Sequence, residues 1–233
     1  RRHHDRVPVD VDRLGHALAT SQRFAADAAH ELRSPLTVIV GQLELSARGL
    51  QGEAKESNER ARQTATRLST LVDRLLVLAT PVAKLDLGEE LDLHNCVDGA
   101  LDLLPPSVWS RVSVLAESEA YVQGDRALLA SLLANALENA LKFSDGSVQV
   151  RLTATPELAI VEVTDDGLGI PEGELERVFE PFFRTRATRA SGIRGHGIGL
   201  SLIAHVAAVH GGTARFAARE RGTTLVVELP RCR

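Results

Sequence analysis

Two long segments with a helical spacing of apolar side chains constrain the fold of this 233-residue chain more than any other feature. In residues 12–48, apolar or small side chains recur every three or four positions, as on one face of a helix. A similar pattern follows in residues 61–82. The two patterns average about 30 residues, which predicts helices on the order of 45 Å long. Gly49 and Gly52 interrupt the patterns, so we expect an antiparallel helical hairpin with a short loop.

A lone hairpin cannot cover both apolar stripes. The positions of the first stripe are Leu14, Leu18, Ser21, Ala25, Ala28, Leu32, Leu36, Ile39 and Leu43. Those of the second stripe are Ala61, Ala65, Leu68, Val72, Leu75, Ala79 and Val82. We therefore expect two copies of the chain to pack as a four-helix bundle in a homodimer. The alternative is that the stripes pack against the second domain of the same chain.

Beyond Pro81 and the Gly88-Glu89-Glu90 stretch, the pattern changes to alternating strands and helices. The expected strands are 90–93, 112–116, 121–123, 147–155, 158–164, 213–217 and 223–229. The expected helices are 94–104, 126–143, 174–179 and 198–210. This mixture predicts an α/β domain with helices layered on one face of a sheet.

The composition excludes several classes of protein. A net charge of −4, from 27 basic and 31 acidic residues, argues against a nucleic-acid partner. The share of 44% hydrophobic and 25% charged residues is typical of a soluble globular protein. Two cysteines provide neither a disulfide framework nor a cysteine-rich metal site. No apolar run approaches the ~18 residues of a membrane span. Methionine is absent, even at position 1, so we expect the chain to be a piece of a longer protein.

Residues 29–36, AHELRSPL, place a nucleophile beside a base and a helix breaker. His30 lies two residues from the apolar stripe on either side, so at about 100° per residue it faces solvent. Glu31 can accept a proton from the imidazole Nδ1, which leaves Nε2 as a nucleophile. Pro35 removes a helical hydrogen bond and crowds the carbonyl of Glu31. The alternatives are an idle surface histidine and a harmless kink.

Asn135, Asn139 and Lys142 have the spacing i, i+4, i+7 and share one face of an expected helix. Two carboxamides and an ammonium suit a hydrated Mg²⁺ and a phosphate chain. Carboxamide oxygens are hard ligands, and Mg²⁺ prefers few protein ligands together with phosphate oxygens. An ordinary polar helix face is the alternative.

A second motif, 165–170 (DDGLGI), follows directly after an apolar strand pattern. A carboxylate at a strand end can accept a hydrogen bond from an adenine amino group, and glycines let the backbone approach the base. This role would fall to Asp165 with Gly167 and Gly169. A tight Asp-Gly turn without a ligand is the alternative.

A third motif, 195–200 (GHGIGL), opens the expected helix 198–210, where backbone N–H groups attract phosphate. Its spacing is neither the dinucleotide-binding fingerprint nor a P-loop. Residues 184–194, just upstream, contain no acidic residue. They contain four arginines, namely Arg184, Arg186, Arg189 and Arg194. We expect this segment to be a long flexible lid over an anion; a solvated basic loop is the alternative.

In order and spacing, these motifs resemble those of the cytoplasmic core of a bacterial sensor histidine kinase. The segment 30–36 resembles its phosphoacceptor box and 135–143 its asparagine box. The segments 165–169 and 195–200 resemble its two glycine boxes, and 178–184 (VFEPFFR) its phenylalanine box. The resemblance covers the chain from about residue 12 to residue 229.

The resemblance implies an all-α hairpin, paired as a four-helix bundle in a dimer, followed by an α/β sandwich. The sandwich would be an ATP-binding domain of the gyrase, MutL and histidine kinase type. We expect residues 1–11 to end an upstream signalling segment and 12–84 to form the dimerisation and phosphotransfer domain. A linker at 85–89 would lead to the catalytic domain, 90–233.

The resemblance also implies individual roles. His30 would be the phosphoacceptor and Glu31 its general base. Asn139, with Asn135 beside it, would hold Mg²⁺, and Lys142 would contact phosphate. The expected nucleotide-binding positions further along the chain are Asp165 (to adenine), Gly167, Gly169, Ile170, Phe183, Arg184 (to the γ-phosphate), Gly195, Gly197, Gly199 and Leu200. Ser34 stands where the family usually carries Thr or Asn; it keeps a hydroxyl, which is compatible with a phosphatase role.

The activity implied is ATP-dependent phosphorylation of His30, followed by transfer to an aspartate of a response regulator. Phosphatase activity toward that regulator is a further expectation. The parent would be a cell-membrane sensor, with this chain as its cytoplasmic portion and its membrane segments absent. Two alternatives are an ATPase clamp of the gyrase and MutL type, in which water is the acceptor, and a degenerate kinase that acts as a scaffold.

Overall fold

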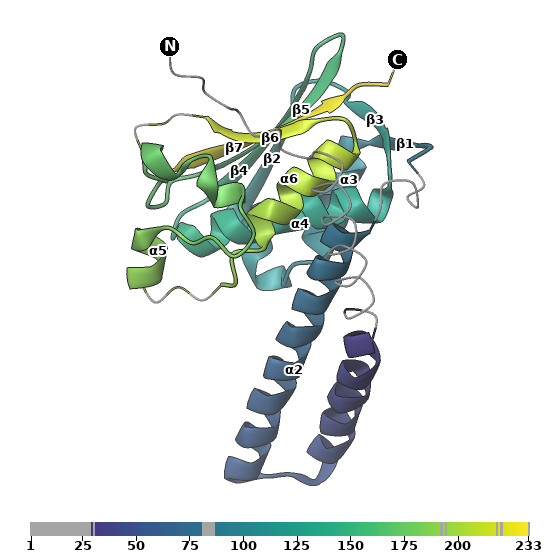
Figure 1. Ribbon diagram of the computed structural model, residues 1–233, viewed down its shortest axis with the longest axis vertical. Helices are drawn as coiled ribbons and strands as arrows, with labels where there is room; N and C mark the ends of the chain where they lie inside the picture. The colour runs from purple at the N-terminus through teal and green to yellow at the C-terminus, as the bar shows by residue number, and fades with distance from the viewer. Residues whose placement is uncertain are drawn as a thin grey trace, which may run out of the picture. The chain divides into compact units, whose positions relative to one another are not determined.

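The computed structural model describes residues 29, 31–80, 87–191, 193, 195–217, 219 and 221–232. The chain divides into two compact units, Arg1–Pro81 and Val82–Arg233. The first unit is helical and the second combines helices with β-sheet, as the sequence predicts (Figure 1). No helix in the described ranges is both long and apolar enough to cross a membrane.

The helical unit is an antiparallel hairpin (Figure 1). Residues 31–46 are helical and continue into a 3₁₀ turn, η1 (Ala47–Gly49), before α2 (Gly52–Ala79). Gly52 opens α2 with a φ of +55°, a backbone conformation that favours glycine. Across the hairpin, the Arg33 guanidinium donates two hydrogen bonds to Asp73, at 2.8 and 2.5 Å. The expected hairpin is therefore confirmed.

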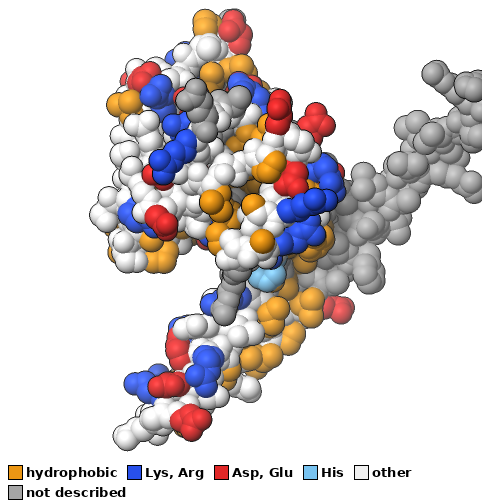
Figure 2. All heavy atoms as spheres, turned by 90° about the vertical axis from the view of Figure 1, so that its left-hand side faces the viewer, with side chains coloured by type: hydrophobic (Ala, Val, Ile, Leu, Met, Phe, Trp, Pro, Cys, Tyr) orange, Lys and Arg blue, Asp and Glu red, His pale blue; other side chains and the backbone are white. Residues whose placement is uncertain are grey.

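Much of the apolar stripe on this hairpin stays exposed. Ala65, Val72 and Ala79 of α2 are buried. Large exposed side chains of the unit are Leu32, Val38, Ile39, Leu45 and Leu68. Figure 2 shows hydrophobic side chains gathered along one side of the hairpin. Contiguous exposed apolar surface of this kind marks an interaction site.

The second unit contains a mixed five-stranded sheet in the order β2-β4-β5-β7-β6. Strand β2 pairs parallel to β4, and every other pair in this sheet is antiparallel. A separate two-stranded sheet joins β1 to β3. The strands are β1 (Glu89–Asp92), β2 (Val112–Ala116), β3 (Tyr121–Gly124), β4 (Val148–Ala154), β5 (Leu158–Asp165), β6 (Thr213–Ala217) and β7 (Thr223–Pro230).

Helices cover one face of the five-stranded sheet and bury the core there (Figure 1). They are α3 (Leu93–Asp102), α4 (Arg126–Phe143) and α6 (Gly199–Val209). Alternate residues of β4 and β5, such as Val150 and Val161, are buried, because a strand with one covered face alternates in burial. Helix α4 begins where the Asp125 carboxylate accepts a hydrogen bond from the Leu128 N–H, at 3.0 Å. The core thus fixes α4 against β5, the two elements that carry the polar motifs.

The structure departs from the expected elements in two places before α6. The helix expected over 174–179 is replaced by two 3₁₀ turns, η4 (Glu172–Glu174) and η5 (Arg177–Phe179). Glu180, before Pro181, is extended, as the residue before a proline tends to be, and the chain leaves the turn there. The flexible lid expected over 184–194 contains a short helix, α5 (Arg186–Ala190). A further 3₁₀ turn, η3 (Pro106–Arg111), leads into β2.

Candidate functional site

One face of α4 carries polar atoms that are buried without hydrogen-bond partners. The Asn135 side chain is buried, and its Nδ2 donates to the Ser131 carbonyl at 2.7 Å. Among the described residues, neither Asn135 Oδ1 nor Asn139 Nδ2 has a partner. Such buried amide atoms are rare in native structures because leaving them unpaired costs about 1–3 kcal/mol each. The face is therefore built to receive a polar ligand.

The 195–200 motif lies directly against this face of α4. A Cβ added at Gly199 would lie 3.3 Å from Asn139 Nδ2 and 3.4 Å from Asn135 Oδ1. A Cβ at Gly195 would collide with Lys142 Nζ. Glycine at these two positions lets the start of α6 approach the amides and the ammonium group. The structure thus brings together motifs that lie about 60 residues apart in the chain, with the N–H groups that open α6 close by.

Asp165 is buried at the end of β5, and both of its carboxylate oxygens are held. Oδ1 accepts a hydrogen bond from the Gly167 N–H at 2.8 Å, and Oδ2 accepts one from the Thr223 hydroxyl. A Cβ at Gly167 would collide with the Phe143 carbonyl, so this turn lies against the C-terminal end of α4. Gly169 has a φ of +74°, which favours glycine. The turn of residues 165–169 is called the Asp165 turn below.

Thr223 is a candidate site residue that sequence reasoning missed. It is the first residue of β7 and pairs with Asp165 in the antiparallel register of β5 and β7. Its hydroxyl donates to Asp165 Oδ2 and so orients that carboxylate. A threonine at the start of a strand carries no signal by itself; only the strand pairing shows its role.

Beside the Asp165 turn, the Ser144 hydroxyl donates a hydrogen bond to Asp166 Oδ1. This hydrogen bond lowers the pKa of Asp166, with smaller contributions from backbone N–H groups and Arg221. The Arg219 guanidinium donates to the Asp165 carbonyl at 3.3 Å. Ser144, Asp166 and Arg219 had no expected role in the sequence, although Asp166 belongs to the DDGLGI motif.

The phenylalanine-box segment is held to the 195–200 motif. The Phe182 N–H donates to the Gly197 carbonyl at 2.8 Å. Gly197 has a φ of +72°, and a Cβ there would lie 2.6 Å from the Phe183 carbonyl. The Arg177 guanidinium lies 4.5 Å from the centre of the Phe183 ring. The close approach of these two loops therefore requires glycine at position 197.

Hydrogen bonds within the arginine-rich segment 184–194 hold this segment together. Arg184 donates to the carbonyls of Thr188, at 2.8 Å, and Ile193, at 2.6 Å. Thr185 caps α5 by accepting a hydrogen bond from the Thr188 N–H. Arg184 thus holds the segment together here, in an arrangement that sequence reasoning did not foresee. Arg194 lies outside the described residues.

The remaining expected site residues have simpler surroundings. Ile170 and Leu200 are half-buried. In the helical unit, Glu31 and Ser34 are exposed on the first helix, one turn apart. His30, the expected phosphoacceptor, lies outside the described residues.

Comparison with known protein families finds two matches along the chain. Residues 20–83 match the His Kinase A (phospho-acceptor) domain. Residues 124–233 match the histidine kinase-, DNA gyrase B-, and HSP90-like ATPase family.

Comparison with individual proteins also finds sensor histidine kinases. Sensor protein CutS of Streptomyces coelicolor is 33% identical over 228 residues, which are 94% of this chain and 55% of CutS. The histidine-protein kinase/phosphatase MprB of a Mycobacterium species is 36% identical over 227 residues, 89% of this chain and 43% of MprB. A solved structure of mycobacterial MprB shares 32% identity and a TM-score of 0.52, covering 62% of this chain and 97% of that one. Full-length ShkA with AMPPNP, at 23% identity, has a similar fold, with a TM-score of 0.75 over 90% of this chain and 46% of that one.

The fold and the site define an ATP-binding domain of the histidine kinase, gyrase B and HSP90 type, preceded by a phospho-acceptor hairpin. The chain belongs to the sensor histidine kinase family. It spans about half the length of the curated relatives it matches, 55% in the case of CutS.

Proposed function

We propose that this chain is the catalytic core of a sensor histidine kinase. It uses ATP to phosphorylate His30 and passes the phosphoryl group to an aspartate of a response regulator. The observation that carries the proposal is the pair of unpartnered amide atoms on α4 that faces the glycine-rich start of α6. The match of residues 20–83 to a phospho-acceptor domain supports the choice of acceptor.

The donor set on α4 fits Mg²⁺ together with a phosphate chain. Asn139 and Asn135 offer carboxamide oxygens, the hard ligands that Mg²⁺ accepts, once the amide of Asn139 is turned toward the ion. Bound Mg²⁺ would supply neutralisation of charge on the phosphate oxygens. Lys142 would contact phosphate, and Gly195, Gly197 and Gly199 would bring backbone N–H groups to it.

The Asp165 turn is our proposed reader of adenine. The carboxylate, oriented by Thr223 and the Gly167 N–H, would accept a hydrogen bond from the exocyclic amine of the base. Glycine at 167 and 169 lets the base approach the backbone. Ile170 and Leu200 would contribute apolar lining, as their half-buried positions allow.

Arg184 and Phe183 belong to the proposed lid over the triphosphate. For Arg184 to reach the γ-phosphate, it would exchange its hydrogen bonds with the Thr188 and Ile193 carbonyls for phosphate oxygens. Charge-assisted bonds to phosphate are stronger than bonds to neutral carbonyls, so nucleotide would favour this exchange.

In the proposed reaction, His30 Nε2 attacks the γ-phosphorus while Glu31 takes the proton from Nδ1. The N–P bond forms as the bond to the bridging oxygen breaks, and that oxygen leaves with ADP. The phosphoryl group then moves from nitrogen to a carboxylate oxygen of the regulator. Ser34, exposed one turn beyond Glu31, would act with water in removing phosphate from the regulator.

The exposed apolar side chains of the hairpin support a homodimer through a four-helix bundle. We propose that residues 12–84 form the dimerisation domain and 90–233 the catalytic domain, with 85–89 as the linker between them. The curated relatives are longer than this chain, which supports a parent sensor with further segments. We propose that those segments anchor the parent at the cell membrane, with this core in the cytoplasm.

Incubation of the chain with γ-labelled ATP and Mg²⁺ tests the proposal. We expect acid-labile, base-stable label on the wild type and none on His30→Gln. His94→Gln is the matched control, because His94 is exposed on a helix and has a carboxylate, Asp98, at 3.6 Å, the surroundings that the sequence predicts for His30. Label on His30→Gln would disprove the acceptor assignment. Free phosphate released without label on the chain would instead indicate the ATPase clamp.

A further inference from the structure

An arginine outside the nucleotide site holds the loop that follows α4. Arg111 ends the 3₁₀ turn before β2, 30 to 35 residues from the groups it contacts. Its guanidinium donates to the carbonyls of Ser144, at 2.6 Å, and Gly146, at 3.0 and 3.1 Å. A longer contact reaches the Leu141 carbonyl, at 3.4 Å. The last carbonyls of a helix lack helical partners, so a cation here satisfies them and complements the helix dipole.

This loop is in turn bonded to the Asp165 turn. Ser144 is buried, and its hydroxyl donates to Asp166 while it accepts from the Gly146 N–H at 3.0 Å. The proton and a lone pair of this hydroxyl are therefore both used. A Cβ at Gly146 would collide with the Asp166 carboxylate, so the two segments lie in direct contact. Asp166 adjoins Asp165, whose carboxylate is aimed by the backbone of the same turn.

We propose that Arg111 and Ser144 are positioning residues that hold the Asp165 turn in the conformation that reads adenine. This inference rests on the proposed function, in which Asp165 binds the base. Arg111 holds the loop 144–146 in place. Ser144, in this loop, holds the Asp165 turn through its hydrogen bond to Asp166. A planar guanidinium holds two carbonyls at once, which a lysine ammonium does with less geometric definition. Arg111 would act from the 3₁₀ turn that precedes the edge strand β2, through the carbonyls of residues 141–146 and not through the nucleotide.

The test measures the Kd for Mg²⁺-ADP by calorimetry on the full chain, and KM and kcat for ATP in autophosphorylation. We expect Arg111→Met and Ser144→Ala to raise Kd and KM about tenfold, equivalent to about 1.4 kcal/mol, with kcat at saturation retained. Arg111→Lys should fall between wild type and Arg111→Met. Ser144→Thr keeps the hydroxyl and should stay near wild type. Loss of folded protein alone would lower the active fraction and kcat, not Kd.

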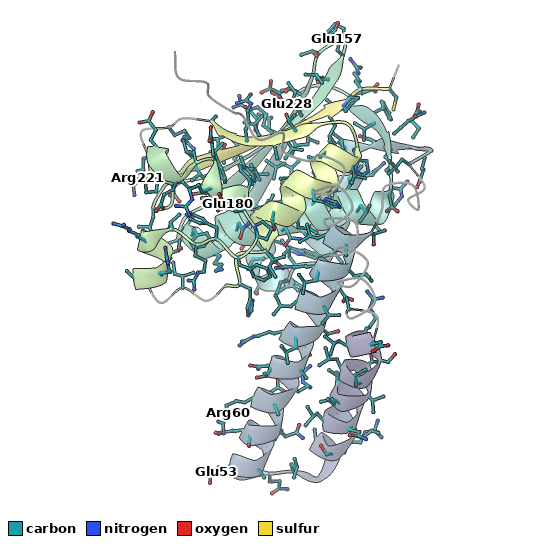
Figure 3. All side chains as sticks on the ribbon, viewed as in Figure 1. Glu53, Arg60, Glu157, Glu180, Arg221 and Glu228 are labelled. Atoms are coloured by element: carbon teal, nitrogen blue, oxygen red, sulfur yellow. The ribbon has the colours of Figure 1, made fainter. Side chains whose placement is uncertain are left out.

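Arg231→Met is the matched control. Arg231 also donates to a backbone carbonyl, that of Thr155 at 3.1 Å, at the β4–β5 turn. Figure 3 marks this turn by Glu157, at the opposite end of the sheet from Arg221. The Kd of Arg231→Met for ADP should equal that of the wild type.

Asp165→Asn distinguishes the proposed adenine-binding role of Asp165 from the proposed positioning role of Arg111 and Ser144. If Asp165→Asn weakens ADP binding while Arg111→Met and Ser144→Ala do not, the positioning role is overturned and the proposed function stands. If Asp165→Asn leaves ADP binding unchanged, the adenine assignment fails and the positioning role fails with it. ADP binding does not depend on His30, so this result is independent of the acceptor assignment.

Discussion

At the scale of single residues, the side-chain amide of Asn139 is unusual. Its Nδ2 atom is buried and has no hydrogen-bond partner among the described residues. Such an atom costs folding free energy that a ligand recovers on binding, as is common at functional sites. A substitution at this position should therefore impair function without lowering the stability of the ligand-free protein.

We expect Asn139→Ala to abolish Mg²⁺-dependent autophosphorylation without lowering the melting temperature of the ligand-free protein. Saturating Mg²⁺-ADP, at 100 times its Kd, should stabilise the wild type by about 2.7 kcal/mol and the variant by much less. Thermal unfolding with and without nucleotide measures both effects. Asn95→Ala, at an exposed helical asparagine of the same unit, should behave as wild type. A wild-type response to ADP in Asn139→Ala would contradict the assignment.

The Ser144–Asp166 hydrogen bond makes stability depend on pH with a defined sign. The Ser144 hydroxyl lowers the pKa of Asp166 below its usual value of 3.8. A carboxyl whose pKa is lower in the folded state stabilises the protein above the unfolded pKa, and this contribution is lost as the pH falls through the folded pKa.

Ser144→Ala should therefore be less stable than wild type at neutral pH, and the difference should shrink from about pH 5 downward. Urea unfolding of both proteins at a series of pH values measures the difference in free energy of unfolding. Ser113→Ala serves as control, because the hydroxyl of the exposed Ser113 donates to a backbone carbonyl, that of Val148 at 3.5 Å, and not to a carboxylate. A Ser144→Ala difference that stays constant into the acid range would exclude Asp166 as the group responsible.

At the scale of elements, α5 shows how a segment with a loop-like composition becomes ordered. The buried Thr185 caps the helix, and Arg184 accounts for two carbonyls of the same segment. Thr185→Ala should remove the cap, which typically contributes about 0.5–2 kcal/mol. Hydrogen exchange of the amides of residues 188–191 should then accelerate, since local opening limits it.

The control for this prediction is Thr155→Ala. Thr155 also accepts a backbone N–H bond, from Leu158 at 3.0 Å, but in the β4–β5 turn. Its loss should leave exchange in α5 unchanged. Equal exchange of α5 in Thr185→Ala and wild type would show that Arg184 alone orders the segment.

At the scale of the whole molecule, the exposed apolar side of the hairpin predicts self-association. Ile39→Lys places a charge within this side and should shift the chain from dimer to monomer, because burying an unpaired charge is costly. Sedimentation equilibrium measures the dissociation constant. Leu103→Lys, at an exposed leucine of the other unit, should leave it unchanged. A monomeric wild type, or a dimer that Ile39→Lys does not weaken, would argue against the bundle.

Much of the molecule could be predicted from the sequence. The bounds of the expected strands lie within one or two residues of the observed bounds. In a half-buried strand, apolar and polar side chains alternate between neighbouring positions, so the pattern is visible in a short stretch of sequence. The helix expected over 126–143 has the observed bounds of α4. The helix expected over 174–179 was wrong, because the segment forms two short 3₁₀ turns and ends at Glu180, which is extended before Pro181.

The sequence by itself determined the two-part architecture, the family and the motif residues, because periodicity and short motifs are written in neighbouring positions. The tertiary structure alone decided which distant groups support those motifs. Thr223 meets Asp165 across 58 residues, Ser144 meets Asp166 across 22, and Arg111 reaches the loop of Ser144 across 33. These contacts depend on strand register and on the paths of loops around the core, which no local pattern of side chains encodes.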